Sequence, residues 1–89
     1  MLPAECFDLV YCHFVLHDIA RAELDRVVPA LAGSLKAGGA LIFREPLNEA
    51  EKLGAIKRLT EQSGLFLKHS RVTDVPLMGN ALESAYLKD

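Results

Sequence analysis

Side chains that could carry out chemistry gather in one short stretch of the sequence. Seven consecutive residues contain Cys12, His13, His17 and Asp18. These side chains could bind a zinc ion. The protein ligands of zinc usually come in closely spaced pairs, however, and this stretch lacks that spacing. We therefore predict no metal site here. Histidine ordinarily titrates close to neutral pH, so the second chemistry to consider is proton transfer to or from a hydroxyl group.

A short apolar segment leads into this stretch. Residues Phe7 to Cys12 are apolar except for Asp8, and they include aromatic and β-branched side chains. Such a run is typical of a strand covered on both faces, as in a parallel sheet. We expect an irregular segment from His13 to Ala20, which would place the candidate residues just beyond the carboxyl end of the strand.

A helix is predicted from Arg21 to Lys36. Its apolar residues have helical spacing: Leu24, Val27, Val28, Leu31 and Leu35. Pro29 falls inside this range and is expected to kink the helix or to divide it in two. The pair Gly38-Gly39 is expected to end the helix and turn the chain. The exposed face of the helix would carry Arg21, Glu23, Asp25 and Arg26.

A second buried strand is predicted from Ala40 to Glu45, and Pro46 would end it. Glu45 lies near the same edge of the sheet as the candidate residues and could contact a substrate. We favour the simpler interpretation that Glu45 is a solvated carboxylate at the strand end, beside Arg44.

The remaining half of the chain predicts one helix and two strands. Asn48 is the expected N-cap of the helix, with Glu49 and Glu51 in its first turn, and Gly64 its expected end. Its inward face would consist of Leu53, Ile56, Leu59 and Thr60. The two strands would span Leu65–Thr73 and Ala81–Lys88, and the short loop from Asp74 to Asn80, which contains Pro76, predicts an antiparallel hairpin.

Length and composition set limits on the class of protein. The 89 residues allow one domain, 1–89, and 51% hydrophobic with 25% charged residues is ordinary for a globular chain. The net charge of −2 and the absence of a Lys/Arg block argue against nucleic-acid binding. No apolar run is long enough to span a bilayer, and the N-terminus does not resemble a signal peptide.

The cysteines favour a cytoplasmic location. Cys6 and Cys12 are the two cysteines of the chain. If both lie in or beside one extended strand, they are about 20 Å apart, which is too far for a disulfide. Reduced thiols in the cytoplasm are the simplest interpretation.

The order strand, helix, strand, helix, strand, strand predicts an α/β fold with a right-handed crossover between the first two strands. Four motifs within this order carry a resemblance. They are Leu2-Pro3 with Phe7-Asp8-Leu9-Val10, Leu16-His17-Asp18-Ile19, Leu35-Lys36-Ala37-Gly38-Gly39, and the terminal segment Ala81–Lys88. Together they resemble the C-terminal half of class I, Rossmann-like S-adenosylmethionine-dependent methyltransferases. The chain departs from the family pattern at Ala37, where the family usually has proline.

The resemblance implies a partial sheet. In that family the strand order is 3-2-1-4-5-7-6, with strand 7 antiparallel, and this chain would supply strands 4, 5, 6 and 7. The glycine-rich cofactor loop and the acidic residue that holds the ribose belong to strands 1 to 3, and they would precede Met1. The chain is therefore expected to be a truncated methyltransferase-like domain that is inactive alone.

The resemblance also implies roles for three residues. In small-molecule O-methyltransferases with an HDW segment, the histidine at the position of His17 is the general base, although Ile19 replaces the tryptophan here. The alternative is that His17 only packs at the head of the helix. By the same resemblance, Cys12 and His13 would approach the methionine portion of S-adenosylmethionine, the implied cofactor. The alternative for His13 is a partly exposed loop residue.

A half-domain of this kind predicts partners. The strand Phe7–Cys12 would have an unpaired edge, and a helix face that packs against the missing half would be bare. We therefore expect a homo-oligomer or a complementing N-terminal half, and a small-molecule substrate if the assembly is active. The competing prediction is a non-catalytic half-domain with a structural or oligomeric role.

Overall fold

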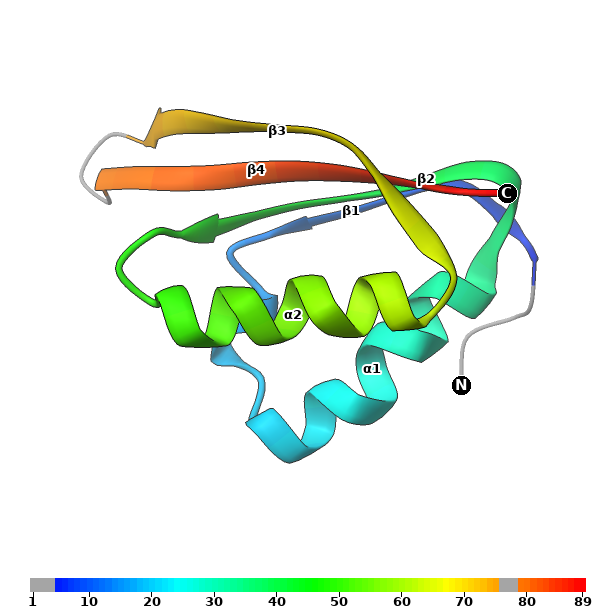
Figure 1. Cartoon of the computed structure of the whole chain (residues 1–89), viewed down its shortest axis with the longest axis horizontal. Coiled ribbons are helices and arrows are strands. Elements are labelled where there is room, and N and C mark those ends of the chain that lie inside the picture. Colours follow the sequence, from blue (N-terminus) through cyan, green and yellow to red (C-terminus); the bar gives the residue numbers. More distant parts are fainter. Residues whose placement is uncertain (1–4, 76–78) are drawn as a thin grey trace.

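The computed structural model describes residues 5–75 and 79–89 and forms two layers. The elements in chain order are strand β1 (Phe7–His13), 3-10 helix η1 (Leu16–Asp18), helix α1 (Arg21–Ser34), strand β2 (Leu35–Pro46), helix α2 (Ala50–Gln62), strand β3 (Leu65–Val75) and strand β4 (Gly79–Lys88). Both helices lie on the same side of a four-stranded sheet (Figure 1). The opposite side of the sheet has no helical layer within the described residues.

The sheet topology confirms the strand order that the resemblance implies. The strands are ordered β1-β2-β4-β3, with β1 and β2 parallel. Strand β4 runs antiparallel to both of its neighbours, and it forms the predicted hairpin with β3. This order corresponds to strands 4-5-7-6 of the methyltransferase sheet. It leaves β1 at one edge, where it pairs with β2 alone.

The core fills the space between the sheet and the helices. Its fully buried members include Leu24 and Val28 from α1, Ile56 from α2 and Phe43 from β2. The Phe43 ring stacks on the ring of Tyr86 from β4, with 5.8 Å between centroids and 14° between planes. The predicted inward face of α2 is confirmed for Leu53, Ile56 and Thr60, while Leu59 is partly buried against the core.

The end of α1 differs from the prediction. The helix ends at Ser34, and Pro29 lies inside it without dividing it. Strand β2 already begins at Leu35, which pairs with Phe7, whereas the next pairing along β1 joins Leu9 to Ala40. The glycine pair therefore sits in an irregular part of the strand. A Cβ atom at Gly39 would come within 2.9–3.2 Å of three backbone carbonyl oxygens, so the close approach of β1 requires glycine there.

Other boundaries shift by a few residues. The N-cap of α2 is Glu49 instead of Asn48, and it makes no side-chain capping bond. Gly64 follows the helix with a φ of 91°, as expected for a left-handed C-terminal stop. Strands β3 and β4 extend further into the hairpin than predicted, and Pro76 lies outside the described residues. In the described part of the chain, neither helix has the length and apolar character needed to cross a membrane.

The prediction that Phe7–Cys12 is covered on both faces is wrong for this chain. Side chains of β1 point alternately to the two faces of the sheet. Val10 and Cys12 pack against the core, while Phe7, Leu9 and Tyr11 are exposed. The two helices cover one face only, so every second residue of β1 meets solvent. We call the uncovered side of the sheet the open face.

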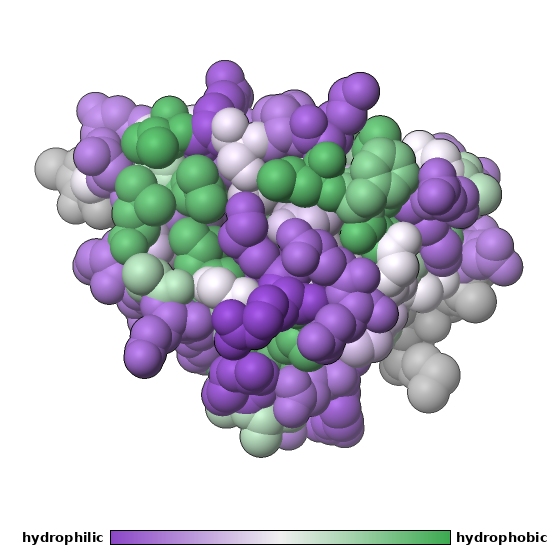
Figure 2. Space-filling model, in the orientation of Figure 1, coloured by the Kyte–Doolittle hydropathy of each residue, from purple (hydrophilic) through white to green (hydrophobic). Residues whose placement is uncertain are grey.

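The bare apolar helix face that we expected is also absent from α1 and α2. The exposed large hydrophobic residues of the described chain are Phe7, Leu9, Tyr11, Val15, Phe66, Leu67 and Val72. All of them lie on strands or on the loop after β1. Figure 2 shows hydrophobic side chains gathered in two areas toward the β3 side of the molecule, with hydrophilic side chains between them. The unsatisfied apolar surface therefore belongs to the sheet.

Lys88 at the end of β4 forms hydrogen bonds with carbonyl groups at the C-terminal end of α1. Its Nζ atom donates to the carbonyl oxygens of Ala32 at 3.0 Å and Leu35 at 2.8 Å. The Ala32 carbonyl also accepts the backbone N–H of Leu35, so Lys88 adds a charged donor at the C-terminal end of the helix, a position that suits lysine. This contact connects β4 to the end of α1, the helix that joins β1 to β2.

We predict that Lys88→Met lowers the free energy of unfolding by about 1–2 kcal/mol, because methionine keeps the aliphatic contacts but donates to neither carbonyl. Urea denaturation measures this change. The matched control is Lys68→Met on the exposed part of β3, which is expected to change stability by less than about 0.5 kcal/mol. Equal losses in the two variants would contradict the capping role.

Candidate active site at the carboxyl edge of the parallel strands

The structure brings His17 and Glu45 together, and it corrects the prediction for Glu45. Glu45 is 1% exposed, so it is not a solvated strand-end carboxylate. Its Oε1 atom lies 2.9 Å from His17 Nδ1 and accepts the backbone N–H of His17 at 3.2 Å. Its Oε2 atom accepts the backbone N–H of Leu16 at 3.2 Å. A buried carboxylate with three donors both orients the histidine and holds η1 in place.

The contact with Glu45 sets the orientation of the His17 ring. A carboxylate only accepts hydrogen bonds, so His17 Nδ1 carries the proton in this pair. In the neutral ring this leaves the lone pair on Nε2, which lies 3.3 Å from Asp18 Oδ1. The Asp18 side chain is 78% exposed and can turn away into water, whereas the His17 side chain is 17% exposed and fixed. Nε2 is therefore the atom available for proton transfer.

Local backbone geometry places His17 beyond the strand. Phe14 has a φ of 54° and its N–H donates to Arg44 O, so the chain leaves β1 by a sharp turn that is still tied to β2. Leu16 then enters the core, at 1% exposure, and anchors η1. The Phe14 ring packs edge-on to the His17 ring, with 6.0 Å between centroids.

Cys12 and His13 lie at the end of β1 but on opposite faces. Cys12 packs against the core, and burial together with the nearby Glu45 carboxylate raises the pKa of its thiol. His13 is exposed on the open face. Both cysteines, Cys6 and Cys12, are free thiols. Cys12 could therefore reach a ligand at the strand end only through its backbone, whereas His13 can use its ring.

A second polar cluster, which the sequence did not reveal, lies on the open face. One row across all four strands consists of His13, Arg44, Glu83 and Arg71. Glu83 Oε1 accepts from Arg71 Nε at 2.9 Å, and Oε2 accepts from Arg44 and from the Tyr11 hydroxyl, both at 3.1 Å. Its one sequence signal is a charged residue among mainly apolar neighbours in each of β2 and β4, Arg44 and Glu83.

Electrostatics in this cluster favour the ionised form of Glu83. Burial alone would raise the pKa of its carboxyl, but hydrogen bonds from Arg71, Tyr11 and Arg44 outweigh it, and the pKa lies below its usual value. The pKa of the Tyr11 hydroxyl is raised, first by burial and then by its hydrogen bond to Glu83. The cluster thus holds one carboxylate between two guanidinium groups.

Because the folded-state pKa of Glu83 is depressed, its contribution to stability is present above the ordinary carboxyl pKa and is lost as pH falls. We predict that the stability difference between the wild type and Glu83→Gln shrinks as pH falls from about 5 to about 3. Urea denaturation across this pH range measures the difference. The control is Glu51→Gln in the exposed first turn of α2. A difference that stays constant with pH would contradict an ionised Glu83 in the fold.

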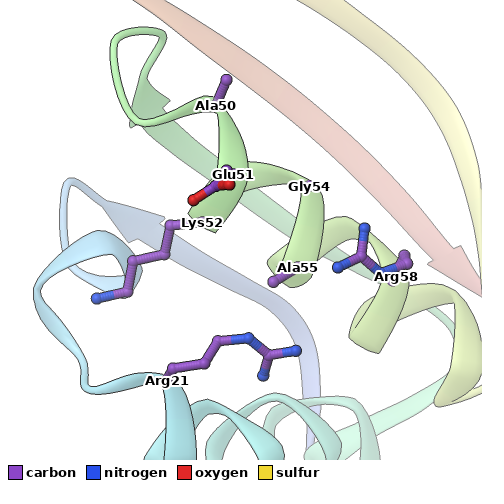
Figure 3. Close-up of a pocket in the computed structure, with 7 residues that line it drawn as sticks. All are labelled: Arg21, Ala50, Glu51, Lys52, Gly54, Ala55 and Arg58. Carbon is purple, nitrogen blue, oxygen red and sulfur yellow. The ribbon is translucent and has the colours of Figure 1, made fainter.

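A shallow groove between the helices lies apart from both clusters. Its volume is about 640 Å³, and it is lined by Arg21, Ala50, Glu51, Lys52, Gly54, Ala55 and Arg58. Arg21 and Lys52 extend into the gap from facing elements (Figure 3). None of the candidate residues lines it, so we place the site at the strand ends. Within residues 5–75 and 79–89, no group of three His, Cys, Asp or Glu side chains could hold a metal ion.

The chain has the fold of the C-terminal part of a class I, Rossmann-like S-adenosylmethionine-dependent methyltransferase, as the resemblance predicted. Residues 1–43 match the family model described as Methyltransferase domain. Among curated proteins, no sequence matches the chain.

Solved structures match almost the whole chain at low sequence identity. A S-adenosylmethionine-dependent methyltransferase from Methanosarcina mazei is 12% identical with a TM-score of 0.80, over 98% of this chain and 61% of the other. The N-methyltransferase NodS from Bradyrhizobium japonicum, in complex with S-adenosyl-L-homocysteine, is 16% identical with a TM-score of 0.77, over 97% and 48%. The [4+2]-cyclase SpnF is 14% identical with a TM-score of 0.71, over 97% and 51%.

Two facts follow from these matches. The chain spans between 48% and 61% of the length of these three structures. One of them is described as a cyclase, so this fold serves more than one reaction and the site must decide the chemistry.

Proposed function

We propose that the chain is the C-terminal part of an S-adenosylmethionine-dependent methyltransferase that acts on a hydroxyl group of a small molecule. The observation that carries this proposal is the pair His17 and Glu45 at the carboxyl edge of two parallel strands. Ligands of open α/β sheets bind at that edge. A histidine oriented by a buried carboxylate is suited to remove a proton from a hydroxyl.

The residues present fit one part of the cofactor. S-adenosylmethionine would supply the methyl group that is transferred. By the resemblance, the methionine portion would pass the end of β1, where this chain offers the exposed His13 ring and the backbone of Cys12. The sequence has no glycine-rich loop between a strand and a helix, the device that brings backbone close to such cofactors. Most contacts with the cofactor would therefore come from another polypeptide segment.

His17 would act through Nε2. Glu45 fixes the ring by binding Nδ1, so the acceptor hydroxyl would give its proton to the opposite nitrogen. Asp18 must first turn away from Nε2, and its exposure allows this. Removing the proton makes the oxygen a stronger nucleophile at the moment of methyl transfer.

The open face and the edge of β1 support a need for a partner. On the open face, Phe7, Leu9 and Tyr11 of β1 and Phe66 of β3 are large, hydrophobic and exposed, and β1 has one free edge among the described residues. A complementing N-terminal half would pair with this edge and cover this face, and a second copy of the chain is the alternative. The same surface favours a second candidate function, a non-catalytic half-domain that serves assembly.

Calorimetric titration with S-adenosylmethionine tests the proposal, with the mass of the chain in solution measured on the same sample. We expect no binding by the monomeric chain, because the cofactor site is half built. Micromolar binding by a monomer would contradict the half-site assignment. Binding by a dimer would instead identify the second copy as the completing partner.

The assembled form gives the test of His17. Where cofactor binds, His17→Gln is expected to slow methyl transfer strongly while leaving cofactor affinity unchanged. Unchanged turnover in that variant would reject the role of His17 as a base and would favour the assembly module.

A further inference from the structure

Phe14, the residue that follows β1, has a backbone conformation that is rare for a bulky side chain. Its φ of 54° lies in the left-handed region, and Glu5 is the other non-glycine residue of the described chain with a positive φ. Glycine adopts this region freely, whereas a Cβ atom makes it strained. The side-chain contacts of Phe14 therefore have to offset a strain that glycine would not have.

These contacts are not made with the hydrophobic core. Among the described residues, neither the buried core nor the partly buried side chains packed against it include Phe14. The aromatic neighbours of its half-buried ring are the two histidines of the candidate site. His13 stacks on it with 4.7 Å between centroids and 22° between planes, and His17 meets it at 84° with 6.0 Å between centroids. The ring therefore contributes to the site and not to the core.

The surroundings of Phe14 hold both its ring and its backbone in place. His13, which stacks on the ring, stacks in turn with Tyr11, with 6.5 Å between centroids. The Tyr11 hydroxyl donates to Glu83 Oε2 at 3.1 Å, which connects this stack to β4. The backbone N–H of Phe14 donates to Arg44 O at 2.9 Å, so β2 holds the turn itself. Phe14 is thus a fixed point beside His17.

The contact with Glu45 alone does not fix the plane of the His17 ring. Glu45 Oε1 lies 2.9 Å from Nδ1, but a hydrogen bond fixes one atom and tolerates a range of angles, so the ring could still tilt. Tilting would move Nε2, the nitrogen on the far side of the ring. The edge-on contact with Phe14 opposes this tilt, because edge-to-face packing is a preferred geometry of aromatic pairs.

We propose that Phe14 is a positioning residue, which holds the plane of the His17 ring and thereby the direction of Nε2. Glu45 fixes the ring at one nitrogen, and Phe14 fixes its tilt. The proposal rests on the proposed function in one respect, because the direction of Nε2 matters for methyl transfer only if His17 is the base. The orientation itself belongs to the folded chain and is measured without cofactor.

The experiment is an NMR relaxation measurement on the chain with isotope-labelled histidine. The order parameter of the His17 ring reports its mobility, on a scale where about 0.85 describes a rigid group and values below about 0.6 a flexible one. We expect a rigid ring in the wild type. Phe14→Leu keeps most of the volume but has no aromatic ring, and it should lower the order parameter to below about 0.6. Phe14→Tyr keeps the ring and should preserve the wild-type value.

The matched control is the same substitution at the other end of β1. Phe7 is 39% exposed and begins the strand, whereas Phe14 follows its last residue. Phe7→Leu should therefore leave the order parameter of the His17 ring unchanged.

A second pair of variants isolates the strain in the backbone. Phe14→Gly and Phe14→Ala both remove the ring and differ by one Cβ atom. Because glycine relieves the strain at a positive φ, we expect its folded-to-unfolded ratio in urea denaturation to be about fivefold higher than that of the alanine variant.

Three results would overturn the proposal. They are a mobile His17 ring in the wild type, equal order parameters in Phe14→Leu and Phe7→Leu, and equal stability of Phe14→Gly and Phe14→Ala. The last result would mean that Phe14 is not left-handed in solution. These measurements require neither cofactor nor turnover. Their failure is therefore distinct from a failure of the methyltransferase proposal, which the calorimetry and the His17→Gln variant decide.

Discussion

Replacing Glu45 with glutamine is expected to lower the free energy of unfolding by about 2–3 kcal/mol, because the carboxylate accepts three hydrogen bonds at a site with almost no access to water. Glutamine has a similar shape, but its amide nitrogen donates and cannot accept from the N–H groups of η1. Glu45→Ala removes the acceptor entirely, and we expect a loss of about 3–5 kcal/mol. Urea denaturation followed by circular dichroism measures both.

Two other variants serve as comparisons for Glu45→Gln. Glu49→Gln changes an exposed carboxylate that makes no capping bond, and it should cost less than about 0.5 kcal/mol. His17→Gln removes the ring contact but keeps both backbone donors, so it should cost less than Glu45→Gln. Nitrogen chemical shifts of the His17 ring should report the proton on Nδ1 in the wild type. A ring protonated only on Nε2 would contradict the orientation by Glu45.

Phe43→Ala is expected to lower the free energy of unfolding by about 3–5 kcal/mol. The side chain is 0% exposed, lies in the middle of β2 and stacks on Tyr86, so its loss leaves a cavity that the sheet cannot close. A loss of this size is a large share of the total stability of a small domain. Phe43→Leu keeps most of the volume, with an expected loss below about 1.5 kcal/mol, and it remains measurable if the alanine variant does not fold.

The control for Phe43 is another phenylalanine. Phe66 on β3 is 45% exposed, and Phe66→Ala should cost less than about 1 kcal/mol in the isolated chain. If the two alanine variants lose equal stability, Phe66 is buried in solution. That result would mean that a second copy covers β3, and a protein concentration series would show it as a shift of the unfolding midpoint.

The sequence predicted the order of the elements because local patterns and motif order are enough for that purpose. The stripe Leu53, Ile56 and Thr60 and the stop at Gly64 are local signals, and the structure agrees with them. The position of β4 between β2 and β3 came from the family resemblance, since no local pattern encodes strand order. Pro29, which we expected to kink or to divide this helix, does not divide it: it lies exposed at the ninth position of the continuous α1, which the core holds through Leu24 and Val28.

The candidate site could be predicted only in part. His17 was visible from its type and position, but its partner was not, because Glu45 lies 28 residues away and a strand-end glutamate is usually solvated. Burial of Glu45 follows from η1 folding back over the end of β2, which is a tertiary effect. The polar cluster on the open face was missed for a similar reason. Its members come from four strands, and only the register of those strands aligns Arg44 with Glu83 and Arg71.

The position of β1 at the edge of the sheet also affects when the candidate site forms during folding and how often it opens. Strand β3 is an edge strand too, but a short hairpin ties it to β4, whereas β1 reaches β2 only after the whole of α1 has crossed over. Long-range pairing of this kind closes late in folding, and such strands open first in local fluctuations. The amides of β1 should therefore exchange with solvent faster than those of β2 and β4. The edge that carries the candidate site would be the last part of this chain to become ordered, and its lifetime would be set by whatever pairs with β1.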